Sequence, residues 1–369
     1  MVAPTATAVA EIHAILQGQD DKNRPIFSVL TKRTYDIGPG GRNTRAEKTR
    51  PFVRVDEYYE DGDPEWATVK YETDLVSFKL ATDVVVIGRA LAPAGKAVPQ
   101  LDVTVEVGDH CKTVRVFGDR HCLYRQNASP AFTDPVPFTE MPIQYERAYG
   151  GKDIRSNPEA PFYYPRNHSG LGLVLKNAKE TVDGLALPNI EDPSDLLTPD
   201  RLLLGEPDRW SAQPLPDGLG WFQRTCYPRS SFTGAMPAYV GIDTVLREET
   251  LGLVPKGQIA LAKQFKLPTF DLHFNNGASR GLALPYLKGD ETIRLVNLTP
   301  SGMLSFRLAG EQPRIMLDIG LGENELQPVL HTICVRLEEM QVDLVWRGAH
   351  EYPGLDWLPE MKKLTAGVF

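Results

Sequence analysis

The stretch LDVTVEVGDHCKTVRVF, residues 101–117, carries the clearest structural signal in the chain. Apolar residues occupy every second position from Leu101 to Val107, and polar residues fill the positions between them. A period of two is typical of a β-strand with one buried face. The Gly-Asp pair that follows can turn the chain back into a second strand over residues 112–117. The stretch therefore predicts a β-hairpin.

The C-terminal part repeats this pattern. Apolar positions alternate through residues 331–337, a Glu-Glu pair follows, and residues 340–346 alternate again. This predicts a closing hairpin in which Trp346 points into the core. Residues 293–297 lead through Thr-Pro-Ser-Gly into residues 303–308, and such a spacer suits a turn between two strands.

Two N-terminal segments also read as strands, but with different burial. Residues 27–37 alternate, which predicts a strand with one half-buried face. Residues 83–88 form a short stretch that begins with an aspartate and continues as an uninterrupted apolar run. Such a run is typical of a strand that is covered on both faces.

Composition agrees with a β fold. Of the 369 residues, 42% are hydrophobic and 24% charged, which is ordinary for a globular protein, while 31 Gly and 30 Pro favour many turns. Helix signals are confined to residues 243–251 and 256–265. We therefore expect a mainly β protein. Its antiparallel sandwich-like or barrel-like sheets should form two closely packed parts, with a long loop-rich middle segment and a few short helices.

The expected organisation has four segments that together form one integrated unit. These are an N-terminal extension (1–24), an N-terminal β part (25–150), a loop-rich middle segment with short helices (151–285) and a C-terminal β part (286–369).

Charge and cysteine usage limit the classes of function. The net charge of −8 argues against general nucleic-acid binding. No apolar run reaches the roughly 18 residues that a membrane helix needs, and the first 16 residues lack the basic start of a secretory signal. The four cysteines are sparse and scattered, which fits free thiols in a reducing cytoplasm. We expect a cytoplasmic protein.

Metal binding finds little support. His110-Cys111 and His121-Cys122 offer four possible zinc ligands, but they lack the C-x-x-C spacing of a zinc knuckle. The strand expected between them would hold them roughly 20 Å apart. We expect no metal and no cofactor.

Catalysis finds little support either. Ser169 lacks the glycine that a nucleophile elbow needs, and Cys226 is more simply a buried thiol. An alternative is an all-β carbohydrate-active hydrolase that uses Glu146, Glu191 or Asp290, because glycosidases need two facing carboxylates. A carbohydrate-binding module with a row of exposed aromatic residues is a further alternative. We expect no enzyme and no catalytic residues.

The middle of the chain, from about residue 145 to 229, is rich in aromatic residues, and tyrosine, tryptophan and arginine often anchor protein interfaces. On this basis the candidate partner-binding residues are Tyr145, Arg147, Tyr149, Trp221 and Arg229. The alternative is that these side chains fill the space beneath long loops.

An ordered set of short motifs gives the chain a family resemblance. The set includes Tyr-Glu-Arg-Ala-Tyr-Gly-Gly at 145–151, Leu-Pro-Asn-Ile-Glu at 187–191, Tyr-Pro-Arg at 227–229, Lys-Gly-Asp-Glu at 288–291 and Trp-Arg-Gly at 346–348. Over about residues 25–350 the chain resembles a bacterial family of domains of unknown function that are encoded beside type VI secretion spike genes.

The resemblance implies a non-catalytic adaptor or chaperone. Such a protein would bind a secreted effector that carries a proline-alanine-alanine-arginine-like tip domain, and would help to load it onto the valine-glycine-repeat spike. The resemblance thus implies the effector as a partner and the spike protein as a second one, without nucleic acid or membrane.

Overall fold

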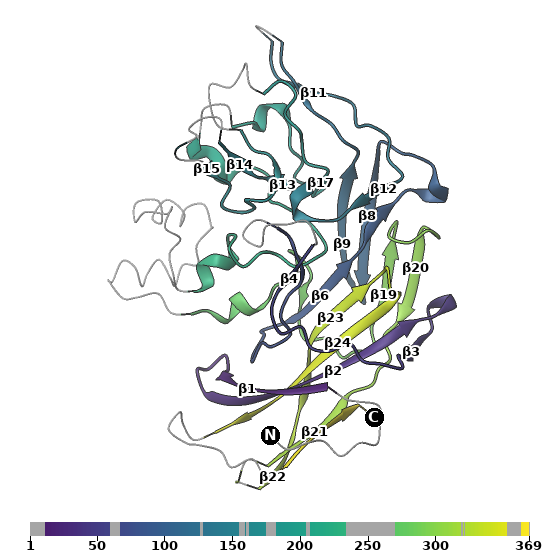
Figure 1. The fold of residues 1–369 in the computed structure, drawn as a ribbon, viewed down its shortest axis with the longest axis vertical. Coiled ribbons are helices and arrows are strands. Elements are labelled where there is room, and N and C mark those ends of the chain that lie inside the picture. The colour runs from purple at the N-terminus through teal and green to yellow at the C-terminus, as the bar shows by residue number, and fades with distance from the viewer. Residues whose placement is uncertain are drawn as a thin grey trace.

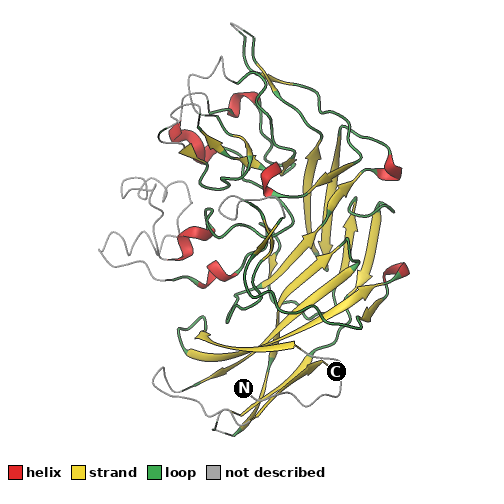
Figure 2. Cartoon of the chain, in the orientation of Figure 1, coloured by secondary structure: helices red, strands yellow, loops and turns green. Residues whose placement is uncertain are grey.

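The computed structural model shows a mainly β protein, as the sequence predicted (Figure 2). Its helical segments are 3-10 turns of at most six residues among those that are described. The two helices expected at 243–251 and 256–265 lie outside the described residues. The structure describes residues 12–59, 67–125, 128–154, 159, 162–174, 182–203, 207–233, 270–318, 320, 322–352 and 363–368.

A central sheet combines both ends of the chain. Its parallel pair is β6 with β23, and its other pairs are antiparallel. β3 (Asn43–Arg45) adds to it by pairing with the end of β2. The strands follow the order β1 (Ile12–Gln19), β2 (Pro25–Ile37), β24 (Gln341–Glu351), β23 (Pro328–Arg336), β6 (Thr82–Ile87) and β18 (Ala283–Leu284).

A second sheet contains the hairpin that the sequence predicted most clearly. β8 and β9 pair from Leu101 with Val116 to Val107 with His110, and Gly108 adopts a φ of 55° in the turn. The expected hairpin of β19 and β20 lies beside β8. The strand order is β17 (Ile190–Glu191), β9 (His110–Phe117), β8 (Gln100–Val107), β19 (Thr292–Val296) and β20 (Met303–Arg307).

The main core lies between these two sheets (Figure 1). Val84 and Ile333 from the central sheet share it with Val103 and Ile293 from the second sheet, and all four are fully buried. Trp346 is also buried there, as predicted. Apolar burial on this scale provides the main driving force for folding.

A third sheet covers one end of the central sheet. It has the order β22 (Glu323–Leu326), β21 (Pro313–Asp318) and β25 (Lys363–Val368). Phe27 and Val29 of β2 pack with Ile315 and Leu317 of β21 in a separate apolar cluster. In Figure 1 this sheet lies at the opposite end of the molecule from the β11–β15 region.

The face of the central sheet that points away from the main core is covered as well. Val85 and Ile87 of β6 pack there against Val69, Tyr71 and other apolar residues. Double coverage explains why all six residues of β6 are buried, as the apolar run predicted. The half-buried face predicted for residues 27–37 is wrong, because β2 is buried almost throughout.

Burial of β2 brings polar residues into the interior. Lys32, Arg33 and Thr34 are all buried. Lys32 Nζ lies 2.7 Å from Asp74 and 4.0 Å from Asp343, so its charge is compensated within the protein. An alternating sequence pattern cannot distinguish this arrangement from exposure to solvent.

The remaining elements are short and mostly belong to the middle of the chain. Five two-stranded pairs link the loops: β4 (Glu57–Tyr58) with β5 (Val69–Tyr71), β7 (Arg89–Leu91) with β12 (Glu140–Pro142), β10 (Cys122–Leu123) with β11 (Ala131–Phe132), β13 (Tyr149–Gly150) with β16 (Leu171–Gly172), and β14 (Lys152–Asp153) with β15 (Phe162–Tyr163). The 3-10 turns are η1 (Pro39–Gly41), η2 (Pro93–Gly95), η3 (Tyr145–Arg147), η4 (Pro199–Arg201), η5 (Pro207–Ala212), η6 (Arg229–Thr233) and η7 (Leu272–Asn275).

The paired glycines at 150 and 151 allow two of these loops to touch. A Cβ atom on Gly150 would lie 2.0 Å from the carbonyl oxygen of Asn167, and the φ of Gly150 is 148°. The Asn167 side chain fills the same junction and donates hydrogen bonds to the carbonyls of Tyr145 and Tyr149, at 2.8 and 3.2 Å. This part of the tyrosine-rich motif therefore has a folding role.

We predict that Gly150→Ala destabilises the protein by about 2 kcal/mol or more, because the methyl group meets backbone and the conformation is strained for alanine. Chemical denaturation would measure the change. Gly220→Ala is the matched control, since nothing lies within 4 Å of the position of its Cβ. Equal stability of the two variants would contradict the close-approach explanation.

Candidate functional site

A buried ion cluster joins the N-terminal β region to the loops of the middle segment. Glu72 follows β5 directly, and its Oε1 accepts hydrogen bonds from Arg224 Nε at 2.9 Å and Arg229 Nη2 at 2.5 Å. Its Oε2 accepts from Arg229 Nη1 at 2.8 Å. The Glu72 and Arg229 side chains are almost completely buried, whereas Arg224 is 31% exposed.

The electrostatics of the cluster keep Glu72 ionised. Burial disfavours the carboxylate, but the Arg229 and Arg224 guanidiniums outweigh that effect and lower the pKa of Glu72 to about 2. A buried carboxylate between two arginines holds both of them in fixed positions, because loss of either contact would leave charge uncompensated.

Arg229 also connects this buried ion cluster to η7. Its Nε donates to the carbonyl of Phe274 at 2.8 Å, and its Nη1 donates to the carbonyl of Phe222 at 2.7 Å. Next to Phe274, Asn275 Nδ2 donates to the carbonyl of Phe78 at 2.6 Å. The cluster therefore fixes η7 against the segment that leads into β6.

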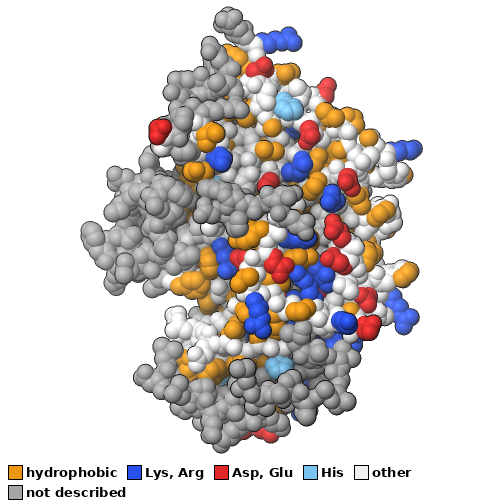
Figure 3. Space-filling model, in the orientation of Figure 1, with side chains coloured by type: hydrophobic (Ala, Val, Ile, Leu, Met, Phe, Trp, Pro, Cys, Tyr) orange, Lys and Arg blue, Asp and Glu red, His pale blue; other side chains and the backbone are white. Residues whose placement is uncertain are grey.

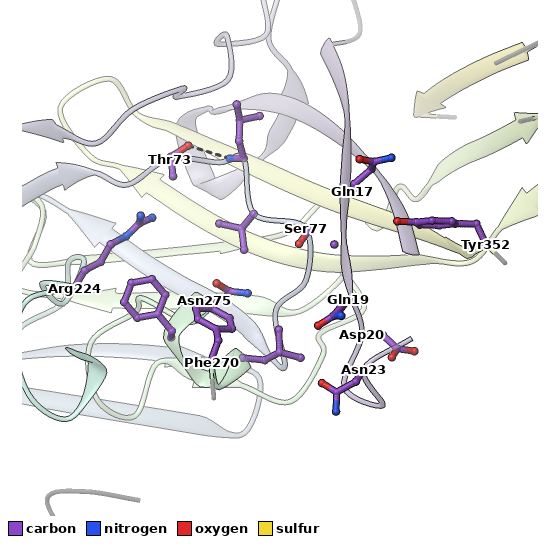
Figure 4. Close-up of a pocket in the computed structure, with 15 residues that line it drawn as sticks. Gln17, Gln19, Asp20, Asn23, Thr73, Ser77, Arg224, Phe270, Asn275 and Tyr352 are labelled. Carbon is purple, nitrogen blue, oxygen red and sulfur yellow. Dashed lines mark hydrogen bonds between the residues drawn. The ribbon is translucent and has the colours of Figure 1, made fainter. Parts of the chain in front are cut away.

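A groove with a cavity volume of about 800 Å³ lies between β1 and η7, and we call it the β1 groove (Figure 4). Figure 4 shows Gln17 and Gln19 on the strand at one side, Arg224 and Phe270 at the other, and Ser77 between them. The described lining residues are Gln17, Gly18, Gln19, Asp20, Asn23, Thr73, Leu75, Val76, Ser77, Arg224, Phe270, Leu272, Phe274, Asn275 and Tyr352.

The groove extends around the edge of β1. On one face of the sheet, Ser77 lies so close to Gly18 that a Cβ there would be 2.3 Å from its Oγ. On the other face, Tyr352 stacks on Phe27, the residue paired with Gln17, with ring centroids 4.4 Å apart. Both flanking residues line the groove. Among the described residues, β1 pairs only with β2, so its other edge has no strand partner.

The described lining of the groove carries one acidic and one basic side chain, Asp20 and Arg224. In the view of Figure 3, acidic and basic side chains lie among one another, with hydrophobic side chains between them. Phe270, at the rim of the groove, is 52% exposed and supplies a large apolar contact surface. The groove therefore offers apolar and polar contacts rather than a field of one sign.

The five residues that the sequence proposed for partner binding lie mostly inside the protein. Tyr145, Tyr149, Trp221 and Arg229 are at most 3% exposed, so they present almost no outer surface for a partner to dock on. Arg147 is the exception, with a side chain 35% exposed. The alternative interpretation, in which these side chains fill space beneath long loops, describes the four buried ones.

The buried aromatic residues form a core of their own under the middle loops. Tyr149 meets Tyr164 edge-on at 5.1 Å between ring centroids, and Tyr164 meets Trp210 edge-on at 6.0 Å. The Tyr149 hydroxyl donates to Gln213 at 3.2 Å. Such pairs stabilise packing beyond simple burial of area.

Several motifs of the chain interlock beside this core. Asn189 Nδ2 donates to Asp119 at 3.0 Å, and Asn189 Oδ1 accepts from Arg147 Nη1 at 3.1 Å. Arg120 forms a buried ion pair with Glu191. Burial raises the pKa of Glu191 to about 7, although Arg120 acts in the opposite direction. These contacts show that the motifs have a structural role, because they hold the loops against one another.

The three carboxylates of the hydrolase alternative have separate structural partners. Glu146 accepts hydrogen bonds from the backbone and hydroxyl of Thr68, and Glu191 pairs with Arg120. Asp290 is exposed and pairs with Arg307 at 2.9 Å. None of the three lines the β1 groove.

The candidate metal ligands do not assemble among the described residues, which contain no group of three or more His, Cys, Asp or Glu side chains placed to hold an ion. All four cysteines are free thiols. Cys226 is buried, and burial raises the pKa of its thiol to about 12, so it is not an activated nucleophile.

Sequence reasoning missed the parts that form the groove. Glu72 and Arg224 are ordinary charged residues in the sequence, and their contact spans 152 positions. Residues 12–19 fall in the predicted N-terminal extension, although the alternation of Ala14, Leu16 and Gly18 with mostly polar neighbours could have suggested a strand.

We predict that Glu72→Gln destabilises the protein by about 3 kcal/mol at neutral pH, because two arginines lose their counter-charge. The folded-state pKa is about 2 and lies below the ordinary value of 4.5, so the stabilisation is present above about pH 5 and is lost as the pH falls toward 2. The stability difference between wild type and variant should therefore shrink over that range in denaturation experiments.

Glu57→Gln is the matched control, because Glu57 is 49% exposed and contacts Arg50 at 3.2 Å. Its expected effect is below about 1 kcal/mol. A Glu72→Gln effect of the same size, or one that does not change with pH, would show that the cluster does not brace the fold.

The comparisons with known proteins place the chain in a family. No helix among the described residues is long and apolar enough to cross a membrane. Comparison with curated proteins and with solved structures finds no match. A family model described as an uncharacterized protein conserved in bacteria, DUF2169, matches residues 22–347. Because that match covers most of the chain, the protein belongs to the uncharacterized bacterial family DUF2169.

Proposed function

We propose that this protein is a non-catalytic adaptor that holds an extended segment of a partner polypeptide along the edge of β1 that has no strand partner among the described residues. The observation that carries the proposal is the β1 groove, which wraps that edge and touches both faces of the strand. An unpaired strand edge presents backbone donors and acceptors in a row, and an incoming strand can satisfy them.

The groove supplies both parts of such recognition. The backbone of β1 would provide affinity through main-chain hydrogen bonds, and the lining side chains would select the residues of the partner. Phe270 offers an apolar contact, while Gln17, Gln19 and Asn23 offer polar ones. We expect an extended partner segment that presents at least one apolar side chain toward Phe270.

Rigid walls support this function. The Glu72 cluster fixes Arg224 and η7, so the wall opposite β1 is already in place before a partner arrives. A preformed site loses less conformational entropy on binding than one that must become ordered.

The identity of the partner is proposed from the sequence motifs. Because the chain resembles domains encoded beside type VI secretion spike genes, we propose that the partner is a secreted effector with a proline-alanine-alanine-arginine-like tip domain. The adaptor would hold the effector in the cytoplasm and help to load it onto the valine-glycine-repeat spike. Shielding of an exposed effector strand before loading would be its chaperone activity.

We predict that Phe270→Asp weakens capture of the co-expressed effector about tenfold or more, because it places a charge at the apolar rim of the β1 groove. Affinity purification with the products of neighbouring genes, followed by titration of the purified partner, would measure the loss. The melting temperature should stay close to that of wild type, since Phe270 is half exposed.

Met303→Asp is the matched control. Met303 has nearly the same exposure, 53%, and lies on β20 at the edge of the second sheet. Equal losses for both variants, or no loss for either, would remove the β1 groove as the docking site. Failure to capture any secreted protein or spike component would reject the adaptor function itself.

A further inference from the structure

A second cavity, of about 420 Å³, lies on the other side of η7 from the β1 groove, and we call it the arginine pocket. The two cavities share η7 as a wall: Leu272 and Phe274 line the groove, whereas His273 lines the pocket. The pocket is largely apolar, with walls from Tyr145, Phe222 and other aromatic and proline residues.

The described lining of the pocket contains three arginines and no acidic residue. Two of these arginines are neutralised by carboxylates that do not line the pocket. Arg229 binds Glu72, and Arg280 lies 2.5 Å from Asp192 and 3.9 Å from Asp217. The third, Arg166, has no carboxylate within ion-pair distance among the described residues.

Arg166 is nevertheless buried, with only 5% of its surface exposed. Its Nη1 donates to the carbonyl of Gln213 at 3.1 Å and to the Tyr164 hydroxyl at 3.3 Å. Its guanidinium carbon lies 5.5 Å from the centre of the Trp210 ring. Its Nε has no hydrogen-bond partner among the described residues. These contacts orient the guanidinium but do not neutralise it.

A buried charge without a counter-charge is costly, and proteins usually pair it. Arginine in particular matches the planar geometry of a carboxylate. We propose that the arginine pocket binds a carboxylate carried on an aromatic or apolar group, with Arg166 as the counter-charge and the aromatic walls around the body of the ligand. One uncompensated guanidinium matches a monoanion better than a phosphate dianion.

The volume of the pocket fits this class of ligand. Sites for small molecules usually enclose about 300–1,000 Å³ and combine apolar walls with a few polar groups. Two sources share the chemistry: the C-terminal residue of a polypeptide and a small aromatic acid. The inference does not depend on the adaptor function, because it rests on Arg166 and a cavity separate from the β1 groove.

Calorimetric titration of the full-length protein tests the proposal with three probes. N-acetyl-phenylalanine mimics a peptide C-terminus, its amide has the same body without the charge, and phenylacetate represents a small acid. We expect at least one acid to bind, and the amide to bind about tenfold or more weakly than N-acetyl-phenylalanine. Tighter binding of N-acetyl-phenylalanine than of phenylacetate assigns the peptide source, and the reverse assigns the small acid.

Arg166→Gln should abolish the preference for the acid over its amide. Arg201→Gln is the matched control, because Arg201 belongs to the same part of the chain, pairs with Asp195 at 2.8 Å and does not line the pocket. The acid–amide comparison on the wild-type protein decides the matter even if Arg166→Gln fails to fold. Equal binding of acid and amide, binding of neither acid, or equally effective displacement by inorganic phosphate would overturn the proposal.

Discussion

The contact of Glu72 with Arg224 and Arg229 is the interaction on which the rest of the candidate site depends. It joins residues more than 150 positions apart in the sequence. A Cβ atom on Gly277 would lie 2.2 Å from Glu72 Oε2, so even the backbone beside the cluster is fitted to the carboxylate. Buried charges of this kind specify one arrangement of loops, because alternative arrangements would leave them unpaired.

Both cavities depend on this brace. Arg224 lines the β1 groove, Arg229 lines the arginine pocket, and η7 between them is tied to Arg229 through the carbonyl of Phe274. The charged side chains that face the two cavities are thus largely fixed by partners beneath the surface. Arg166 differs, since aromatic and carbonyl groups hold it rather than a carboxylate.

The fold could be predicted from the sequence where paired strands are adjacent along the chain. The β8–β9 hairpin and the buried Trp346 follow from alternation and turn residues, because each strand pairs with a neighbour that is adjacent in the sequence. The candidate site could not be predicted from the sequence, for two physical reasons. Its contacts are long-range, and the edge that we propose for docking belongs to β1, whose pairing with β2 depends on a sheet completed by the C-terminal strands. Aromatic residues that suggested an interface, such as Tyr149, instead form a core beneath loops.

Hydrogen exchange of the protein with and without the proposed partner tests the central claim most directly. In the free protein, the outer edge of β1 has no strand neighbour among the described residues, so those alternate amides of residues 12–19 that point away from β2 should exchange readily. Strand addition predicts that these amides become strongly protected in the complex, more than those of β20 at the edge of the second sheet. Unchanged exchange in residues 12–19 of a fully formed complex, with protection on another surface, would contradict the account.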